Sequence, residues 1–186
     1  MKRIFDLVLA IFLIIIFSFP FFIIAALVFF TSEGPIFNWS DRVGKNNKIF
    51  KMPKFRSMFI DAPVVPTHLL INPDLYLTSI GSFLRRSSLD ELPQLFSVLK
   101  GDMSFVGPRP VISNEVNLIA LRIKKGVDTL LPGITGWAQV NGRDKLSTSH
   151  KVALDFEYLN RQSCWFDIKI LWITFLKVIQ GDDVSH

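Results

Sequence analysis

The sequence predicts an α+β fold that is mostly helical. We expect a compact domain with a short β-hairpin on an N-terminal re-entrant membrane helix, together with interfacial amphipathic helices. Residues 7–30 contain no charged side chain, and apolar residues alternate with polar or basic ones over 36–58. Apolar residues recur at helical spacing in 89–99, 113–125 and 151–180. These observations together predict the fold class.

Composition sets the first limits on function. The chain has 186 residues, 49% of them hydrophobic, and a formal net charge of +5. The length suits one domain, the high apolar fraction excludes low-complexity disorder, and the positive net charge favours an anionic partner. A single cysteine, Cys164, excludes an internal disulfide framework and argues against a cysteine zinc site. We expect two parts: a membrane helix-hairpin over 1–32 and a second domain over 33–186.

The uncharged segment over 7–30 would form a helix of about 36 Å, against about 30 Å of bilayer hydrocarbon. It is too long for the core of a signal peptide and lacks a cleavage pattern. Lys2 and Arg3 precede it and more basic residues follow, and basic flanks prefer the cytoplasm. A re-entrant path that bends at Ser18 and Pro20 keeps both flanks on that side. A single span that tolerates Pro20 is the alternative.

Strands are predicted over 36–42 and 48–56, joined by a turn at 44–48. Pro53 suits only an edge or an end of a strand. A proline-rich loop follows over 61–78, in which a short helix is left open.

Helices are predicted where the apolar spacing is helical, and Gly101 is a stop signal for the first of them. Residues 126–149 should be rich in loops. The apolar face of 151–180 suits a helix in the membrane interface or an ordinary core helix equally well.

The first stretch that could carry a catalytic or metal-binding residue follows Arg85 in the sequence. Ser88 and Glu91 have the spacing of a capping box, which would put Asp90 and Glu91 in a first helical turn. A carboxylate there could bind Mg²⁺ or attack phosphorus. It could also do no more than cap the helix.

Two further stretches could bind phosphate. Prolines on both sides of Arg109 restrict its backbone, and its guanidinium matches phosphate oxygens. The glycine-rich stretch 132–143 permits close backbone approach to a ligand and ends in Arg143. Taken alone, the first could be only a rigid surface turn.

Taken together, these stretches resemble the small monotopic phosphoglycosyl transferases, the bacterial sugar transferases that begin lipid-linked glycan assembly. The matching stretches are the Ser-Pro-broken apolar N-terminus, KMPKFRSM at 51–58, SLDELPQL at 88–95, LKGDMSFVGPRP at 99–110, PGITG at 132–136 and NGR at 141–143. One departure is that Phe19 separates Ser18 from Pro20.

The resemblance implies transfer of a sugar-1-phosphate from a UDP-sugar to polyprenyl (undecaprenyl) phosphate, with Mg²⁺ and release of UMP. It implies that Asp90 is the nucleophile, forms a phosphosugar-aspartyl intermediate and lies beside Mg²⁺, and that Glu91 assists. Arg109 and Arg143 would hold the phosphates of the donor. Lys54, Arg56 and Arg85 are weaker candidates for the lipid phosphate or the active-site network.

The expected location is the cytoplasmic face of a bacterial inner membrane, in a glycan pathway such as that of exopolysaccharide. Membrane lipids are expected partners, nucleic acid is not, and a homodimer is left open. The rival functions are a glycosyltransferase that releases UDP and a non-catalytic membrane adaptor. Nothing in the sequence encodes which sugar is transferred.

Overall fold

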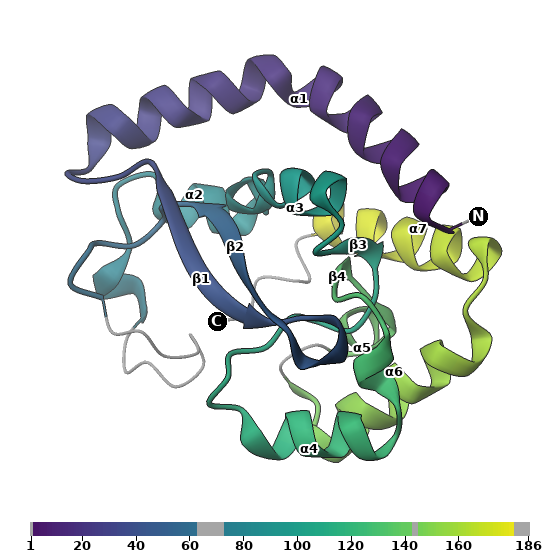
Figure 1. Ribbon diagram of the computed structural model, residues 1–186. Coiled ribbons are helices and arrows are strands. Elements are labelled where there is room, and N and C mark those ends of the chain that lie inside the picture. Colours follow the sequence, from purple (N-terminus) through teal and green to yellow (C-terminus); the bar gives the residue numbers. More distant parts are fainter. Residues whose placement is uncertain (1, 63–72, 143–144, 181–186) are drawn as a thin grey trace.

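The computed structural model describes residues 2–62, 73–142 and 145–180 (Figure 1). Its described residues form a mostly helical α+β fold with a short antiparallel strand pair, which confirms the predicted fold class. A long N-terminal helix arches over the remaining elements, which gather beneath it (Figure 1).

The N-terminal helix α1 (Lys2–Thr31) is helical through Pro20, so it curves as an arch rather than folding back as two antiparallel helices. Ser18 donates its hydroxyl to the carbonyl of Ile15 at 2.8 Å. Among the described residues it is the one helix long and apolar enough to cross a membrane. Its outer face exposes large apolar side chains: Ile4, Val8, Phe12, Ile15, Phe19, Phe22 and Phe30.

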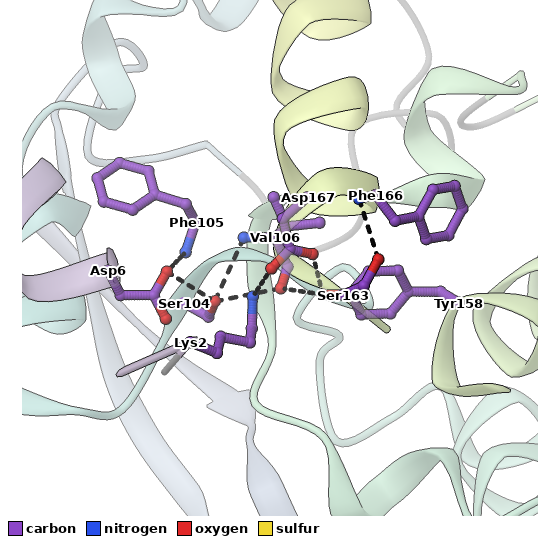
Figure 2. Close-up of polar contacts among 9 residues, drawn as sticks. All are labelled: Lys2, Asp6, Ser104, Phe105, Val106, Tyr158, Ser163, Phe166 and Asp167. Atoms are coloured by element: carbon purple, nitrogen blue, oxygen red, sulfur yellow. Dashed lines mark hydrogen bonds and ion pairs between the residues drawn. The ribbon is translucent and has the colours of Figure 1, made fainter. Parts of the chain in front are cut away.

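The N-terminal end of α1 is tied to the domain by polar contacts (Figure 2). Lys2 pairs with Asp167 at 2.7 Å, and the buried carboxylate of Asp6 accepts hydrogen bonds from Ser104 Oγ and the Phe105 amide. The hydroxyl of Tyr158 lies 2.6 Å from the other carboxylate oxygen of Asp167. Burial and this hydrogen bond hold the pKa of Tyr158 well above its usual value, so the phenol stays a neutral donor.

The other end of α1 is held by packing. Ile24 and Val28 are buried with Phe55 and Leu84 in one apolar cluster. Just beyond the helix, the guanidinium of Arg56 donates to the carbonyl and hydroxyl oxygens of Ser32 at 2.7 and 2.8 Å. Both ends of α1 therefore contact the same folded body, about 45 Å apart along the helix.

The predicted hairpin is confirmed: β1 (Phe37–Val43) and β2 (Ile49–Phe55) pair antiparallel. A 3₁₀ turn, η1 (Lys45–Asn47), joins them, and two asparagines supply its left-handed backbone. Pro53 faces Trp39 in a sheet of only two strands, so its missing donor interrupts no central ladder.

The expected capping box at Ser88 is wrong. Ser88 has a left-handed backbone (φ 56°) and its side chain caps nothing. Asp90 and Glu91 lie in a separate 3₁₀ turn, η4 (Leu89–Glu91), between the helices α2 (Gly81–Arg86) and α3 (Gln94–Lys100). The helix predicted to begin near Ser88 thus begins after Pro93, and it ends at Gly101 as expected, where φ is 97°.

A parallel pair that the sequence did not predict joins β3 (Ser104–Val106) to β4 (Gly133–Thr135). Strands of three residues are too short to show alternation, and tertiary pairing decides them. The remaining described elements are η3 (Pro73–Tyr76), α4 (Val116–Lys124), η5 (Val127–Thr129), α5 (Trp137–Val140), α6 (Thr148–Arg161) and α7 (Cys164–Gln180).

The apolar face of α7 is not an ordinary core face. Phe166 and Ile170 are buried against the main core, whereas Ile168, Trp172, Phe175 and Ile179 are exposed. Of the two interpretations that the sequence left open, the exposure of these side chains favours the membrane interface.

We expect Asp167→Ala to lower the free energy of unfolding by about 2 kcal/mol, because Lys2 loses its ion-pair partner and the buried Tyr158 hydroxyl loses a charged acceptor. The hydroxyl keeps the Val106 carbonyl as an acceptor, at 3.1 Å. Urea unfolding of the detergent-solubilised chain measures this loss of stability. Asp102→Ala is the control, because Asp102 pairs with the exposed Lys100 and should cost under about 1 kcal/mol. Equal losses in the two variants would contradict a stabilising role for the buried cluster.

Candidate active site

The centre of the candidate site is a lysine between two carboxylates. Lys54 Nζ in β2 lies 2.6 Å from Glu91 Oε1 and 3.5 Å from Asp90 Oδ2 in η4. The Asp90 side chain is only 8% exposed, and those of Glu91 and Lys54 are 18% and 24% exposed. The three charges therefore interact where water screens them poorly.

The 3₁₀ turn itself holds the two acids in place. The amides of Glu91 and Leu92 donate to the carbonyls of Ser88 and Leu89, which closes the turn. Leu89 and Leu92 pack against the apolar cluster beneath the C-terminal half of α1. Apolar packing on one side of the turn thus fixes the direction of the carboxylates on the other.

The pKa of Asp90 is raised above its usual value, chiefly because burial disfavours its ionised form. The neighbouring charge of Glu91 raises it further, whereas Lys54 and Arg85 lower it. The ionised form that a nucleophile needs is therefore supported by the two cations against the cost of burial.

A cleft of about 280 Å³, partly open to solvent, begins at this cluster. Lys54 and Glu91 line it, and so do Arg42 and Arg109. The pKa of Arg42 is lowered by burial and then by the charge of Arg109, so the two guanidinium groups repel each other across a small space. Fixed cations crowded in a cleft form a site for a multivalent anion.

Arg42 is a site residue that sequence reasoning missed, because it was counted with the basic flank of the membrane segment. A signal was present in the hairpin register. Asn38 faces Lys54 and Ser40 faces Met52, so Arg42 lies two residues further along the same face of the sheet. Gln94, which was not predicted, also lines the cleft, and so does Gly133 of the glycine-rich stretch that was expected to approach a ligand.

The loop that carries Arg109 is packed against β4 without intervening side chains. Gly107 donates to the Thr135 carbonyl, and Gly133 donates to the Pro108 carbonyl, each at 2.9 Å. A Cβ on Gly133 would lie 2.1 Å from the Gly107 nitrogen. Glycine is required here because the two backbones touch, and this contact places Arg109 at the edge of the cleft.

The structure brings together four of the predicted site residues: Lys54, Asp90, Glu91 and Arg109. Arg85 donates to Ser57 Oγ at 3.1 Å, and its charge acts on Asp90.

One other predicted residue, Arg56, does not join the cluster. Arg56 does not line the cleft, and its guanidinium binds Ser32 at the end of α1. Arg143 lies outside the described residues. Ser18 and Pro20 belong to α1.

The described residues contain no cluster of three or more acidic, histidine or cysteine side chains that could hold a metal ion alone. Mg²⁺ is commonly bound by one or two carboxylates together with substrate phosphates. The partly buried dyad beside a cationic cleft fits that mode, and a divalent cation there would offset the burial cost of ionised Asp90.

Comparison with known proteins places the chain in a family. The family model described as bacterial sugar transferase matches residues 1–181. The chain is 38% identical to "Uncharacterized sugar transferase EpsL" of Bacillus subtilis over 186 residues, which is 100% of this chain and 91% of the relative.

Two longer relatives carry names that state an activity. The chain is 43% identical to a "UDP-glucose:undecaprenyl-phosphate glucose-1-phosphate transferase" of Escherichia coli, over 95% of this chain and 40% of the relative. It is 39% identical to an "Undecaprenyl-phosphate galactose phosphotransferase" of Salmonella typhimurium, over 98% of this chain and 41% of the relative. The chain thus spans most of EpsL but about two fifths of these two relatives.

We expect Asp90→Asn to make the fold more resistant to urea at pH 7. A raised pKa means that ionised Asp90 is less favourable in the folded than in the unfolded chain, so this destabilisation exists above the folded pKa. It disappears as the pH falls below the ordinary value of 3.8, so the two proteins should converge in acid.

Urea titrations between pH 7 and pH 3 measure the difference and its disappearance in acid. Asp102→Asn serves as control, because the ion pair of Asp102 is with an exposed lysine. A loss of stability in Asp90→Asn at pH 7 would show that the carboxylate is held by favourable interactions that exceed its burial cost.

Proposed function

The chain belongs to the bacterial sugar transferase family, and we propose that it transfers a sugar-1-phosphate from a UDP-sugar to polyprenyl phosphate. The observation that carries the proposal is the partly buried Asp90–Glu91 dyad, held by Lys54 beside a cleft lined by Arg42 and Arg109. The names of the relatives in Escherichia coli and Salmonella typhimurium support the substrate classes.

The first proposed step is an attack by a carboxylate oxygen of Asp90 on the phosphorus that bears the sugar. A bond forms between that oxygen and phosphorus, the bond from phosphorus to the UMP oxygen breaks, and UMP leaves with the electron pair. Lys54 compensates the charge of the nucleophile, and Glu91 helps to orient it through their shared contact with Lys54.

In the second step a phosphate oxygen of the lipid attacks the same phosphorus. The phosphosugar-aspartyl bond breaks and Asp90 returns as a carboxylate, which leaves a polyprenyl diphosphate sugar. Both steps bring anions to a carboxylate, so they require fixed cations. We assign the donor diphosphate to Arg109 and Arg42, and also to Arg143, as the resemblance implies. Arg85 and Arg56 remain weaker candidates for the lipid phosphate or the active-site network.

Mg²⁺, held by Asp90 together with substrate phosphates, would neutralise negative charge on the diphosphate when it is bound. The chain's own residues still orient the donor: Arg109 and Arg42 from the cleft wall, and Lys54 from the sheet.

The proposed position is at the cytoplasmic face of a bacterial inner membrane, with α1 re-entrant. The docking of both ends of α1 on one folded body supports this path, because a straight crossing would separate the ends. The exposed apolar faces of α1 and α7 support contact with lipid, where the acceptor's tail lies.

The decisive experiment identifies the nucleotide that is released. The full chain, reconstituted with undecaprenyl phosphate, is given Mg²⁺ and a panel of UDP-sugars that includes UDP-glucose and UDP-galactose. We expect UMP from at least one donor, loss of UMP release of about a thousandfold or more in Asp90→Asn, and loss on chelation by EDTA. Asp102→Asn is the matched control and should keep wild-type turnover.

Each rival function has its own outcome in this assay. Release of UDP would identify a glycosyltransferase, and membrane binding without any nucleotide release across the panel would identify an adaptor. Turnover at the wild-type rate in Asp90→Asn would refute the nucleophile.

Arg42 provides a second test. We expect Arg42→Ala to raise the KM for the UDP-sugar by roughly tenfold, because a charge-assisted contact to phosphate is lost. Lys51→Ala is the control: Lys51 lies on the same hairpin and its side chain is 74% exposed, paired with Asp41 at 3.8 Å. Equal kinetics of the two variants would exclude Arg42 from donor binding.

A further inference from the structure

A buried ion pair lies behind the loop that carries Arg109. The guanidinium of Arg122 in α4 donates from Nη2 and Nε to Asp155 Oδ2 in α6, at 2.7 and 3.0 Å. Its remaining nitrogen, Nη1, donates to the backbone carbonyl of Arg109 at 2.9 Å. Asp155 is 1% exposed and the Arg122 side chain is 11% exposed.

We propose that Asp155 and Arg122 are positioning residues that hold Arg109 in the orientation needed to bind the donor diphosphate. The proposal rests on the proposed function, and it assigns to α4 and α6 a part in substrate binding that neither the dyad nor the cleft lining includes.

The first argument is that, within the described part of the chain, the hydrogen bond from Arg122 is the one that holds Arg109 itself. Both its neighbours are prolines, which offer no N–H to the surrounding structure. The loop is otherwise fixed on either side of Arg109: Gly133 donates to Pro108, and Val43 donates to the carbonyl of Val111. The carbonyl of Arg109 itself is held by Arg122.

The second argument is geometric. The hydrogen bond that holds the carbonyl of Arg109 also holds the peptide plane that joins Arg109 to the next residue. Proline restricts the plane on the other side, so the Cα–Cβ direction of Arg109 is set. Its side chain then extends into the cleft where Arg42 and Glu91 also lie. A preorganised arginine loses less freedom when it binds phosphate.

The third argument is that the pair is firmly anchored. Val111, Leu118 and Val152 form a buried apolar cluster that joins the loop to α4 and α6. A buried ion pair commonly adds little stability over an apolar replacement of the same volume. A guanidinium that holds both a carboxylate and a loop carbonyl performs a task that an apolar side chain could not.

The test compares Arg122→Lys with Lys124→Gln, a control at an exposed lysine of the same helix. Lysine keeps a positive charge beside Asp155 but lacks the planar fork that also reaches the Arg109 carbonyl. We expect the KM for the UDP-sugar to rise by roughly tenfold in Arg122→Lys, with kcat within about twofold of the wild type. Asp155→Asn should show the same pattern, and Lys124→Gln should match the wild type.

A double-mutant cycle separates positioning from a general effect on the fold. In an Arg109→Ala background, Arg122→Lys should raise the KM no further, since there is no longer a side chain to orient. Additive effects in the cycle, or parallel losses of kcat and thermal stability in Arg122→Lys, would overturn the proposal.

Hydrogen exchange provides a readout without turnover. Amide exchange in the peptide 105–112 should be faster in Arg122→Lys than in the wild type, whereas exchange in peptides from α2 and α3 should not change. Unchanged exchange in 105–112 would overturn the proposal. If the wild type releases no UMP from any donor, the proposed function fails, and this arm still decides whether Arg122 holds the loop.

Discussion

The candidate site depends on how a buried carboxylate remains usable as an anion. Burial raises the pKa of Asp90, and the adjacent Glu91 raises it further. Lys54, which extends from the hairpin, lowers the pKa of Asp90 more than Arg85 does, and lies 3.5 Å from Asp90 and 2.6 Å from Glu91. The hairpin and the 3₁₀ turn must therefore stay in register with each other, and much of the surrounding packing serves that requirement.

The long N-terminal helix contributes to the same arrangement. Its C-terminal half packs Ile24 and Val28 against Phe55 of the hairpin, one residue beyond Lys54 in the chain. Its N-terminal end is joined through Lys2 and Asp6 to α7 and β3, as Figure 2 shows. β3 leads directly into the loop that bears Arg109. The helix α1, whose outer face is apolar, is thus connected through buried contacts to both walls of the cleft.

The cleft wall opposite the dyad follows from close backbone contact. Gly107 and Gly133 allow two segments that are distant in sequence to meet without side chains between them. Arg42 arrives from the hairpin and Arg109 from this loop, so the cationic cleft is assembled from two separate parts of the chain. Neither arginine is close to the acids in sequence, and their convergence is a property of the folded state.

The sequence by itself determined the apolar helix and the hairpin with its turn. It also indicated Asp90, Glu91 and Arg109 as candidate site residues, and Lys54 as a weaker candidate through the family resemblance. Those features are local: charge, alternation, turn residues and short motifs are visible within a few positions. Only the tertiary structure decided that Asp90 lies in a 3₁₀ turn rather than a capped helix, that β3 pairs with β4, that Arg42 faces the cleft, and that Arg56 faces Ser32. The reason is physical. These features depend on the packing of Leu89 and Leu92, on contact between glycine backbones and on the register of the hairpin. Each is an interaction between segments that are distant in sequence, so no local pattern contains it.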